Sequence, residues 1–379
     1  MRSNRPARTA PHFPGRSWSN LEASDAGFNS CRLAEAIQFA RDSECDWPRS
    51  LYLADGRFVG TAYVEDRPPH DTALGIVRER GGTNGVIVRG GRIVSEWGDV
   101  TRPDVTFSVA KSYLALVAGL AVDDGLIGSI DETLASRHLD DGFDTPHNQA
   151  ITWRHLLQQT SEWQGTLWDR PDSVDHHRQV LGSHDNAGKG VARKLEAPGT
   201  RWEYNDVRVN RLALSLTRLF RRSLGEVLRD RIMEPLGASS SWEWHGYANS
   251  VIEIDGRPVP SVSGGSHWGG GLFVSSLDHA RIGLLLQRNG MWNDRQLISP
   301  RWIEFLRTPV PSNPLYGALW WLNTACALYP SAPPTSLFAV GGGTHLIWID
   351  AEHDLVMVAR WMVRDRCDEL IRRVVASFV

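Results

Sequence analysis

One apolar stretch stands out in the sequence: Ser108-Val-Ala-Lys-Ser-Tyr-Leu-Ala-Leu-Val-Ala-Gly-Leu-Ala-Val-Asp-Asp-Gly125. It follows Val105-Thr-Phe107, whose β-branched and aromatic residues are typical of a short strand. The stretch predicts a helix that stops at Gly125, because glycine is common just past a helix C-terminus. Apolar residues occur on nearly every side of this helix, so we expect it to be buried.

Lys111 is the exception within this apolar helix. The sequence has 41 basic side chains, and only Lys111, Lys189 and Lys194 are lysines. A desolvated lysine can lose its proton and act as a base, which arginine cannot. Because Ser108 and Lys111 are three residues apart, they share one helix face, where the amine can activate the hydroxyl. The alternative is that Ser108 caps the helix while Lys111 extends to solvent. We interpret Lys189 and Lys194 as residues of a polar loop.

Two further motifs carry chemistry. Tyr204-Asn205-Asp206 supplies a tyrosine that can relay protons beside a lysine, although a core tyrosine with Asp206 as a helix cap is the alternative. Gly341-Gly342-Gly343 follows a strand-like segment and can leave backbone N–H groups free to hold an oxyanion. The alternative for the Gly341–Gly343 motif is a glycine-rich turn between strands.

Together the three motifs resemble the penicillin-recognising serine hydrolases. The chain is most similar to their class C β-lactamase branch, which also holds D-alanyl-D-alanine peptidases, β-lactamase-like esterases and 6-aminohexanoate-dimer hydrolases. The resemblance covers about residues 80 to 365, and it extends to the segments Ile151–Ser161, Ser266–Leu272 and Trp348–Val356.

The resemblance implies a role for each motif. Ser108 matches the acylated nucleophile, Lys111 its general-base partner, and Tyr204 the residue that passes the proton to the leaving group. The oxyanion hole would be formed by the backbone N–H groups of Ser108 and Gly342. No G-x-S-x-G occurs in the sequence, which disfavours a Ser-His-Asp hydrolase.

Two departures from the family pattern bear on the substrate. Ala339-Val340-Gly341 stands where β-lactamases and peptidases carry Lys-Thr-Gly, so the usual anchor for a substrate carboxylate is missing. Asp206 replaces an asparagine, and an anionic neighbour would favour a protonated Lys111 and shift the base role toward Tyr204. Both departures favour an esterase or amidase.

The remaining candidates surround this site. We expect Asp206, His267, Gly341, Gly343 and His345 to contact substrate, and Trp163, Trp168 and Trp268 to form an aromatic rim. Trp320-Trp321 is predicted to lie in the core. His176, His177 and His184 lack metal-ligand spacing, so we interpret the polar stretch 169–189 as a solvated loop. We therefore expect no metal and no cofactor.

The pattern of elements predicts an α+β fold: an antiparallel sheet flanked by helices, with a mostly helical insert. Hairpin signals occur at 85–98 and strand signals at 337–340, 344–350 and 354–363, and a helix is expected at 367–378. We predict a mobile arm over residues 1–25, a sheet domain from 26–107 and 265–379, a helical domain from 108–264, and a catalytic cleft between the two domains.

Composition excludes other classes of protein. The net charge of −3 and the near-neutral pI of about 6.5 argue against nucleic-acid binding. No apolar run approaches the length of a membrane span, and the N-terminus lacks the apolar stretch of a secretory signal. Cys31, Cys45, Cys326 and Cys367 have no metal or disulfide spacing. We expect a cytoplasmic monomer or homodimer.

The sequence thus predicts a serine hydrolase that cleaves a small ester or amide through an acyl-enzyme. β-Lactamase or D-alanyl-D-alanine peptidase activity is one alternative, and acyl transfer to an alcohol or amine is another. An alternative of another class is an inactive ligand-binding or sensor module on the same fold.

Overall fold

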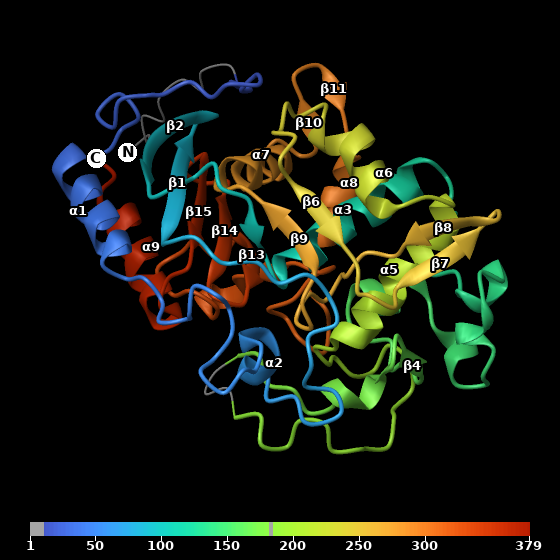
Figure 1. Cartoon of the computed structure of the whole chain (residues 1–379). Coiled ribbons are helices and arrows are strands. Elements are labelled where there is room, and N and C mark those ends of the chain that lie inside the picture. Colours follow the sequence, from blue (N-terminus) through green and yellow to red (C-terminus); the bar gives the residue numbers. More distant parts are fainter. Residues whose placement is uncertain (1–10, 182–184) are drawn as a thin grey trace.

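A computed structural model describes residues 11–181 and 185–379 (Figure 1). The helices are α1 (Ser30–Arg41), α2 (Val59–Tyr63), α3 (Val109–Asp123), α4 (Trp153–Leu157), α5 (Asp206–Phe220), α6 (Leu224–Leu228), α7 (Ser276–Gln287), α8 (Pro300–Leu306) and α9 (Cys367–Ala376). The strands are β1 (Asn84–Arg89), β2 (Arg92–Trp97), β3 (Asp104–Val105), β4 (Thr166–Leu167), β5 (Arg170–Pro171), β6 (Glu243–His245), β7 (Val251–Ile254), β8 (Arg257–Pro260), β9 (Gly271–Val274), β10 (Met291–Trp292), β11 (Arg295–Gln296), β12 (Trp321–Leu322), β13 (Leu337–Gly341), β14 (His345–Asp350) and β15 (Leu355–Arg360).

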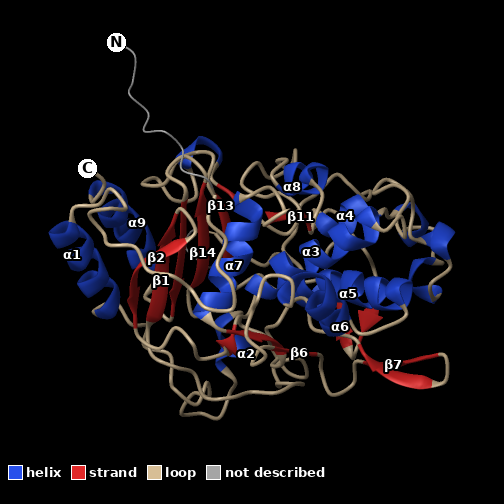
Figure 2. Ribbon diagram, turned by 90° about the horizontal axis from the view of Figure 1, so that it is seen from above, coloured by secondary structure: helices blue, strands red, loops and turns tan. Residues whose placement is uncertain are grey.

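The main sheet has six strands from the two ends of the chain, in the order β12-β13-β14-β15-β1-β2, and all neighbours are antiparallel. The inner strands β13, β14, β15 and β1 are mostly apolar because both faces are covered, whereas the edge strand β2 also carries Arg92, Ser95 and Glu96. In β15, Val356 and Val358 pack on the face that carries α7, while Leu355, Met357 and Ala359 pack toward α1 and α9. Figure 2 shows the sheet between these two layers. The predicted α+β fold with a helical insert is confirmed.

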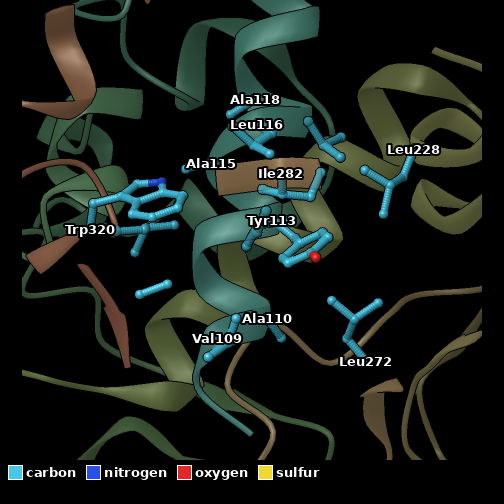
Figure 3. Close-up of a cluster of buried hydrophobic side chains, with 14 of the residues drawn as sticks. Val109, Ala110, Tyr113, Ala115, Leu116, Ala118, Leu228, Leu272, Ile282 and Trp320 are labelled. Atoms are coloured by element: carbon cyan, nitrogen blue, oxygen red, sulfur yellow. The ribbon is translucent and has the colours of Figure 1, made fainter. Parts of the chain in front are cut away.

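Helix α3 is the apolar centre of the other half of the molecule. Thirteen of its fifteen residues are buried, as the sequence predicts. Figure 3 shows α3 side chains among apolar side chains of other elements, with Ile282 of α7 and Leu228 of α6 beside the upper part of the helix and Leu272 of β9 beyond Tyr113. Gly119 has a packing role, because a Cβ there would lie 2.4 Å from the Trp302 ring, whose N–H donates to the Ala115 carbonyl.

The predicted mobile arm is wrong for residues 11–25, and residues 1–10 lie outside the described part of the chain. Ile93 on the sheet edge accepts from the Leu21 N–H at 2.8 Å and donates to the Ser19 carbonyl at 3.0 Å. Nearer the N-terminus, the Arg16 carbonyl accepts from the Arg281 guanidinium at 2.9 Å. Backbone pairing therefore fixes a segment whose Arg- and Pro-rich composition suggested mobility.

Within the described residues, no helix combines the length and the apolar composition that a membrane span requires. All four cysteines are free thiols.

Candidate active site

Ser108 stands at the turn between β3 and α3. The residue before it, Phe107, has a φ of +46°, a left-handed conformation that side chains rarely adopt. This turn leaves Ser108 only half-buried, while its neighbours on both sides are buried. The Ser108 hydroxyl makes no capping bond to the helix, and Lys111 is 1% exposed. The alternative of a capping serine with a solvent-extended lysine is therefore wrong.

The Lys111 ammonium is surrounded by three oxygens. It donates to Ser108 Oγ at 3.0 Å and to the Gly265 carbonyl at 3.1 Å. Asp206 Oδ1 lies 2.5 Å away, in an ion pair that is not aligned as a hydrogen bond. A buried ammonium needs such a carboxylate to compensate the loss of hydration. Lys111 is therefore placed as a donor toward Ser108, in keeping with the expected effect of an aspartate at position 206.

Six buried ionisable residues form a closed ring beside Lys111, in which carboxylates and cations alternate. None of their side chains is more than 5% exposed. We call this the charge ring; its members in order are Asp206, Arg178, Asp175, Lys189, Asp66 and His267.

Arg178 and Lys189 join three carboxylates of the ring. Arg178 Nη1 lies 2.9 Å from Asp206 Oδ2 and 3.4 Å from Asp175 Oδ1. The Lys189 ammonium lies 3.2 Å from Asp175 Oδ1 and also contacts Asp66. The Asp206 backbone N–H donates to the Asp175 carboxylate at 2.7 Å, which fixes the start of α5 on the ring.

His267 closes the ring. Its Nδ1 contacts the Asp206 carboxylate, and its Nε2 lies 2.9 Å from the Asp66 carboxylate. Since a carboxylate only accepts, both ring nitrogens carry hydrogen and the imidazole is charged. Burial lowers the pKa of His267, but Asp66 and Asp206 outweigh it and raise the pKa above its ordinary value.

The carboxylates respond in the opposite direction. Burial would raise the pKa of Asp206, but Arg178, Lys111 and His267 hold it well below its usual range. Burial acts in the same way on Asp66, yet His267 and Lys189 lower the pKa of that carboxyl to about 2. With every member charged, the six-residue ring is neutral, and Lys111 adds one positive charge beside Ser108.

Asp66, Asp175 and His267 lie close enough together to resemble a metal site, with ligand atoms within 4.8 Å of one another. The Lys189 ammonium, however, already contacts both carboxylates. A metal ion at this point would have to displace it, so the donor set fits an internal lysine better than a metal.

Tyr204 lies beside these cations. Lys111 Nζ is 4.6 Å from the centre of its ring, and Arg178 Cζ is 5.2 Å from it. Trp321 stacks on the tyrosine with ring centres 5.9 Å apart. The Tyr204 hydroxyl bonds to none of the described residues and is available to a partner in the pocket.

The glycine motif brings β13 against the start of α3. A Cβ on Gly341 would lie 2.3 Å from the Thr106 carbonyl and 3.3 Å from Ser108 N, so only glycine permits this approach. Among the described residues, neither the Ser108 N–H nor the Gly342 N–H donates to another group. Both residues line the pocket, as an oxyanion hole requires.

These groups face a pocket of about 210 Å³. Its wall is largely apolar. The aromatic lining residues are Trp47, Tyr63, Phe107, Tyr204, Trp321 and Tyr329, and the aliphatic ones include Val180, Leu181, Leu328, Val340, Met362 and Val363. Among the predicted contacts, His267 and the three glycines Gly341, Gly342 and Gly343 line the pocket, and Asp206 lies behind it against Lys111.

The prediction that three tryptophans form an aromatic rim around the site is wrong. Trp163 is buried and donates its ring N–H to the Gly142 carbonyl, and Trp168 packs edge-on against Tyr247. Trp268 is buried and donates to Asp66 at 2.6 Å. None of the three belongs to the pocket lining.

Two more predicted placements change. His345 is 1% exposed and accepts from Arg360 Nε at 2.8 Å, away from the pocket lining. Burial and Arg360 lower the pKa of His345 well below its usual range, so it is a neutral core residue. Trp321, predicted as core together with Trp320, is buried but also forms part of the pocket wall.

The polar stretch 169–189 is not the solvated loop that the sequence suggested. Asp172, Asp175, His176 and Arg178 are buried, whereas His177 is exposed and His184 lies outside the described residues. Lys189 is 3% exposed. The rarity of lysine in this chain, which singled out Lys111, also pointed to Lys189.

The fold and the pocket together define a molecule of the β-lactamase and penicillin-binding-protein type. The chain belongs to the Beta-lactamase family, which it matches over residues 76–362. Six pocket residues from Cys45 to Val64, and the ring carboxylate Asp66, precede this matched range.

Solved structures with this fold include hydrolases. EstCE1, a hydrolase with promiscuous acyltransferase activity, has a TM-score of 0.55 at 16% identity and covers 91% of this chain and 98% of its own. A family VIII carboxylesterase has a TM-score of 0.55 at 16% identity, with 79% and 93% covered. A penicillin-binding protein homologue from Caulobacter crescentus has a TM-score of 0.55 at 16% identity, with 85% and 97% covered. No curated protein sequence matches the chain.

Proposed function

We propose that this protein is a serine hydrolase that cleaves small esters or amides through an acyl-enzyme on Ser108. The observation that carries the proposal is the placement of the Ser108 hydroxyl. It accepts from Lys111 at 3.0 Å and lines the pocket together with Tyr204 and Gly342.

The charge arrangement favours Tyr204 as the base. Lys111 donates to Ser108 and is held by Asp206, so it has no lone pair to offer in this state. Lys111 also leaves one uncompensated positive charge beside the neutral charge ring. A Tyr204 phenolate would balance it, and its oxygen would accept the Ser108 proton.

The reaction then runs through two steps. Ser108 Oγ attacks the substrate carbonyl while its proton passes to Tyr204, and the carbonyl oxygen takes negative charge between the N–H groups of Ser108 and Gly342. Tyr204 returns the proton to the leaving alcohol or amine. Water then gives a proton to the same tyrosine and attacks the ester carbonyl of the acyl-enzyme. The bond from the acyl carbon to Ser108 Oγ breaks, Tyr204 returns the proton to Oγ, and the acid is released.

The pocket wall supports an ester or a simple amide over a β-lactam. Val340 lines the pocket where the Lys-Thr-Gly motif would place a hydroxyl, and Ala339 is fully buried where that motif would place its lysine. The largely apolar wall suits an apolar acyl or alcohol group. We keep the division into a sheet domain (26–107, 265–379) and a helical domain (108–264), with the pocket between them, as part of this proposal.

The first test is covalent labelling of Ser108. A fluorophosphonate should add to the wild type and not to Ser108→Ala, as seen by intact mass. Turnover of p-nitrophenyl butyrate should fall at least about a thousandfold in that variant. Full activity in Ser108→Ala would remove the nucleophile assignment. A folded wild type that neither labels nor turns over would favour a binding or sensor module.

A substrate panel separates the remaining activities. Wild type and Ser108→Ala are compared on p-nitrophenyl esters, an anilide, a linear amide dimer and nitrocefin. Preferred turnover of nitrocefin would favour a β-lactamase. Product formation with an added alcohol in place of water would favour acyl transfer.

A further inference from the structure

Arg178 lines the pocket, and one edge of its guanidinium has no hydrogen-bond partner among the described residues. Its side chain is 5% exposed and lines the pocket together with Ser108 and Tyr204. The charge-ring contacts use Nη1, which faces Asp175 and Asp206. Nε is buried without a hydrogen-bond partner, and Nη2 donates to none of the described residues.

Buried N–H groups are nearly always paired, so an orphaned donor at a pocket wall points to a missing acceptor. The Nε–Nη2 edge of a guanidinium presents two parallel N–H groups, which match the two oxygens of a carboxylate. A carboxylate on the substrate would accept from the unpaired Nε and Nη2 of Arg178, as Asp175 and Asp206 already pair with Nη1.

The charges around the pocket agree with an anionic ligand. The charge ring is neutral as a whole, and a Tyr204 phenolate would balance Lys111, so these groups together do not repel an anion. Arg364 is a further cation in the lining, whereas Asp46 is the carboxylate there, and it is exposed. The other lining residues are mainly apolar, so one anionic group on an apolar body fits the wall.

From these observations we infer that Arg178 is an anchor for a substrate carboxylate, and that the substrates are esters or amides which carry one. This inference rests on the proposed function and names its substrate class. The anchor comes from the helical half of the molecule, beside Asp206 and α5. It therefore lies apart from β13, where Ala339 and Val340 replace the Lys-Thr-Gly anchor of β-lactamases.

The test compares two esters of matched length, neutral p-nitrophenyl valerate and anionic mono-p-nitrophenyl glutarate. The wild type should prefer the glutarate, with kcat/KM at least about tenfold higher. Arg178→Gln should abolish this preference, mainly through a higher KM for the glutarate. Arg178→Lys keeps the charge that Asp175 and Asp206 need but lacks the two-donor edge, so it should lose most of the preference as well.

Arg364→Gln is the matched control, because it removes the other arginine of the pocket wall. It should keep the preference for the glutarate. Loss of the preference in Arg364→Gln together with its retention in Arg178→Lys would overturn the assignment. Equal kcat/KM for the two esters in the wild type would also overturn it.

Binding to the wild type gives a readout that needs no variant and no turnover. Calorimetric titration should show that glutarate binds at least about tenfold more tightly than glutaramide. Equal affinities would refute the carboxylate anchor even if Ser108 were labelled by a fluorophosphonate. Conversely, tight glutarate binding without Ser108 labelling would refute the hydrolase and leave the anchor in place.

Discussion

Helix α3 and the charge ring lie side by side, and both are almost completely buried, yet they are built on opposite principles. The helix packs apolar side chains that contribute through burial and need no particular partner. The ring holds six ionised groups, each of which depends on two named neighbours. The helix therefore supplies stability, and the ring fixes the positions of the charges around Ser108. Four predictions test this division.

The largest effect is expected from Asp206→Ala. It leaves Lys111, Arg178 and His267 without their shared carboxylate, and breaking a buried ion pair costs about 3–5 kcal/mol. Activity should be lost as well. Urea unfolding and ester turnover measure the two effects. Asp206→Asn, which keeps the shape of the side chain, should be more stable than Asp206→Ala, but its ester turnover should remain well below that of the wild type. An Asp206→Ala protein with wild-type stability would contradict the role of the ring.

Leu116→Ala tests the apolar helix α3, the other region in the comparison with the charge ring. Leu116 is fully buried in α3, and truncation of a buried leucine costs about 2–5 kcal/mol. Because the change lies away from the pocket lining, kcat at a temperature where the variant is folded should stay within about twofold of the wild type. A large fall in kcat would show that α3 also positions the catalytic groups.

A smaller effect is expected in the pH dependence of stability. The raised pKa of His267 means that its contribution is complete below the ordinary value of 6.5 and is lost as the pH rises through the raised value. The pKa of Asp66 falls from 3.8 to about 2, so its contribution is present above pH 3.8 and is lost as the pH falls toward 2.

The ring should therefore stabilise the protein most between about pH 4 and 6.5. A tenfold change in a group's proton affinity on folding corresponds to about 1.4 kcal/mol of stability. Urea unfolding from pH 3 to 9 should show the alkaline decline in the wild type and a flatter profile in His267→Gln. Leu116→Ala should lower the whole profile without changing its shape. Parallel curves for wild type and His267→Gln would refute a charged His267.

The smallest effect is expected from Trp163→Phe. The change removes the hydrogen bond from the indole N–H to the Gly142 carbonyl, worth about 1 kcal/mol, and keeps most of the packing. Ester turnover should not change, because Trp163 is outside the pocket lining. A change in KM would restore Trp163 to the aromatic rim that the sequence suggested.

The same contrast explains what the sequence could and could not predict. The buried helix, the strands β13 to β15 and the Ser108, Tyr204 and Gly341 motifs are local patterns, readable over a few residues. The ring is not local: Asp66 meets His267 across 201 positions of the chain and Lys189 across 123. Hydrophobic periodicity carries no signal for such pairs, since a buried aspartate looks like a surface aspartate.

The prediction of which aromatic residues line the pocket failed for a related reason. A tryptophan in a strand or loop of this Trp-rich chain gives no sign of which face it lines. Trp163 follows one segment of family resemblance and Trp268 lies within another, but both are buried outside the pocket lining. Trp47 and Tyr63, in contrast, reach the pocket from before the region of family resemblance.

The closed shape of the charge ring also constrains how this protein can diverge. Each member forms ion pairs with two neighbours, so its replacement by a neutral residue leaves two partners without an ion pair and changes the net charge of the whole site. Replacement of an adjacent cation and anion together would keep the balance. Among descendants of this chain, the six positions should therefore be retained as a set or exchanged in pairs, and only the pocket wall around them can drift one residue at a time.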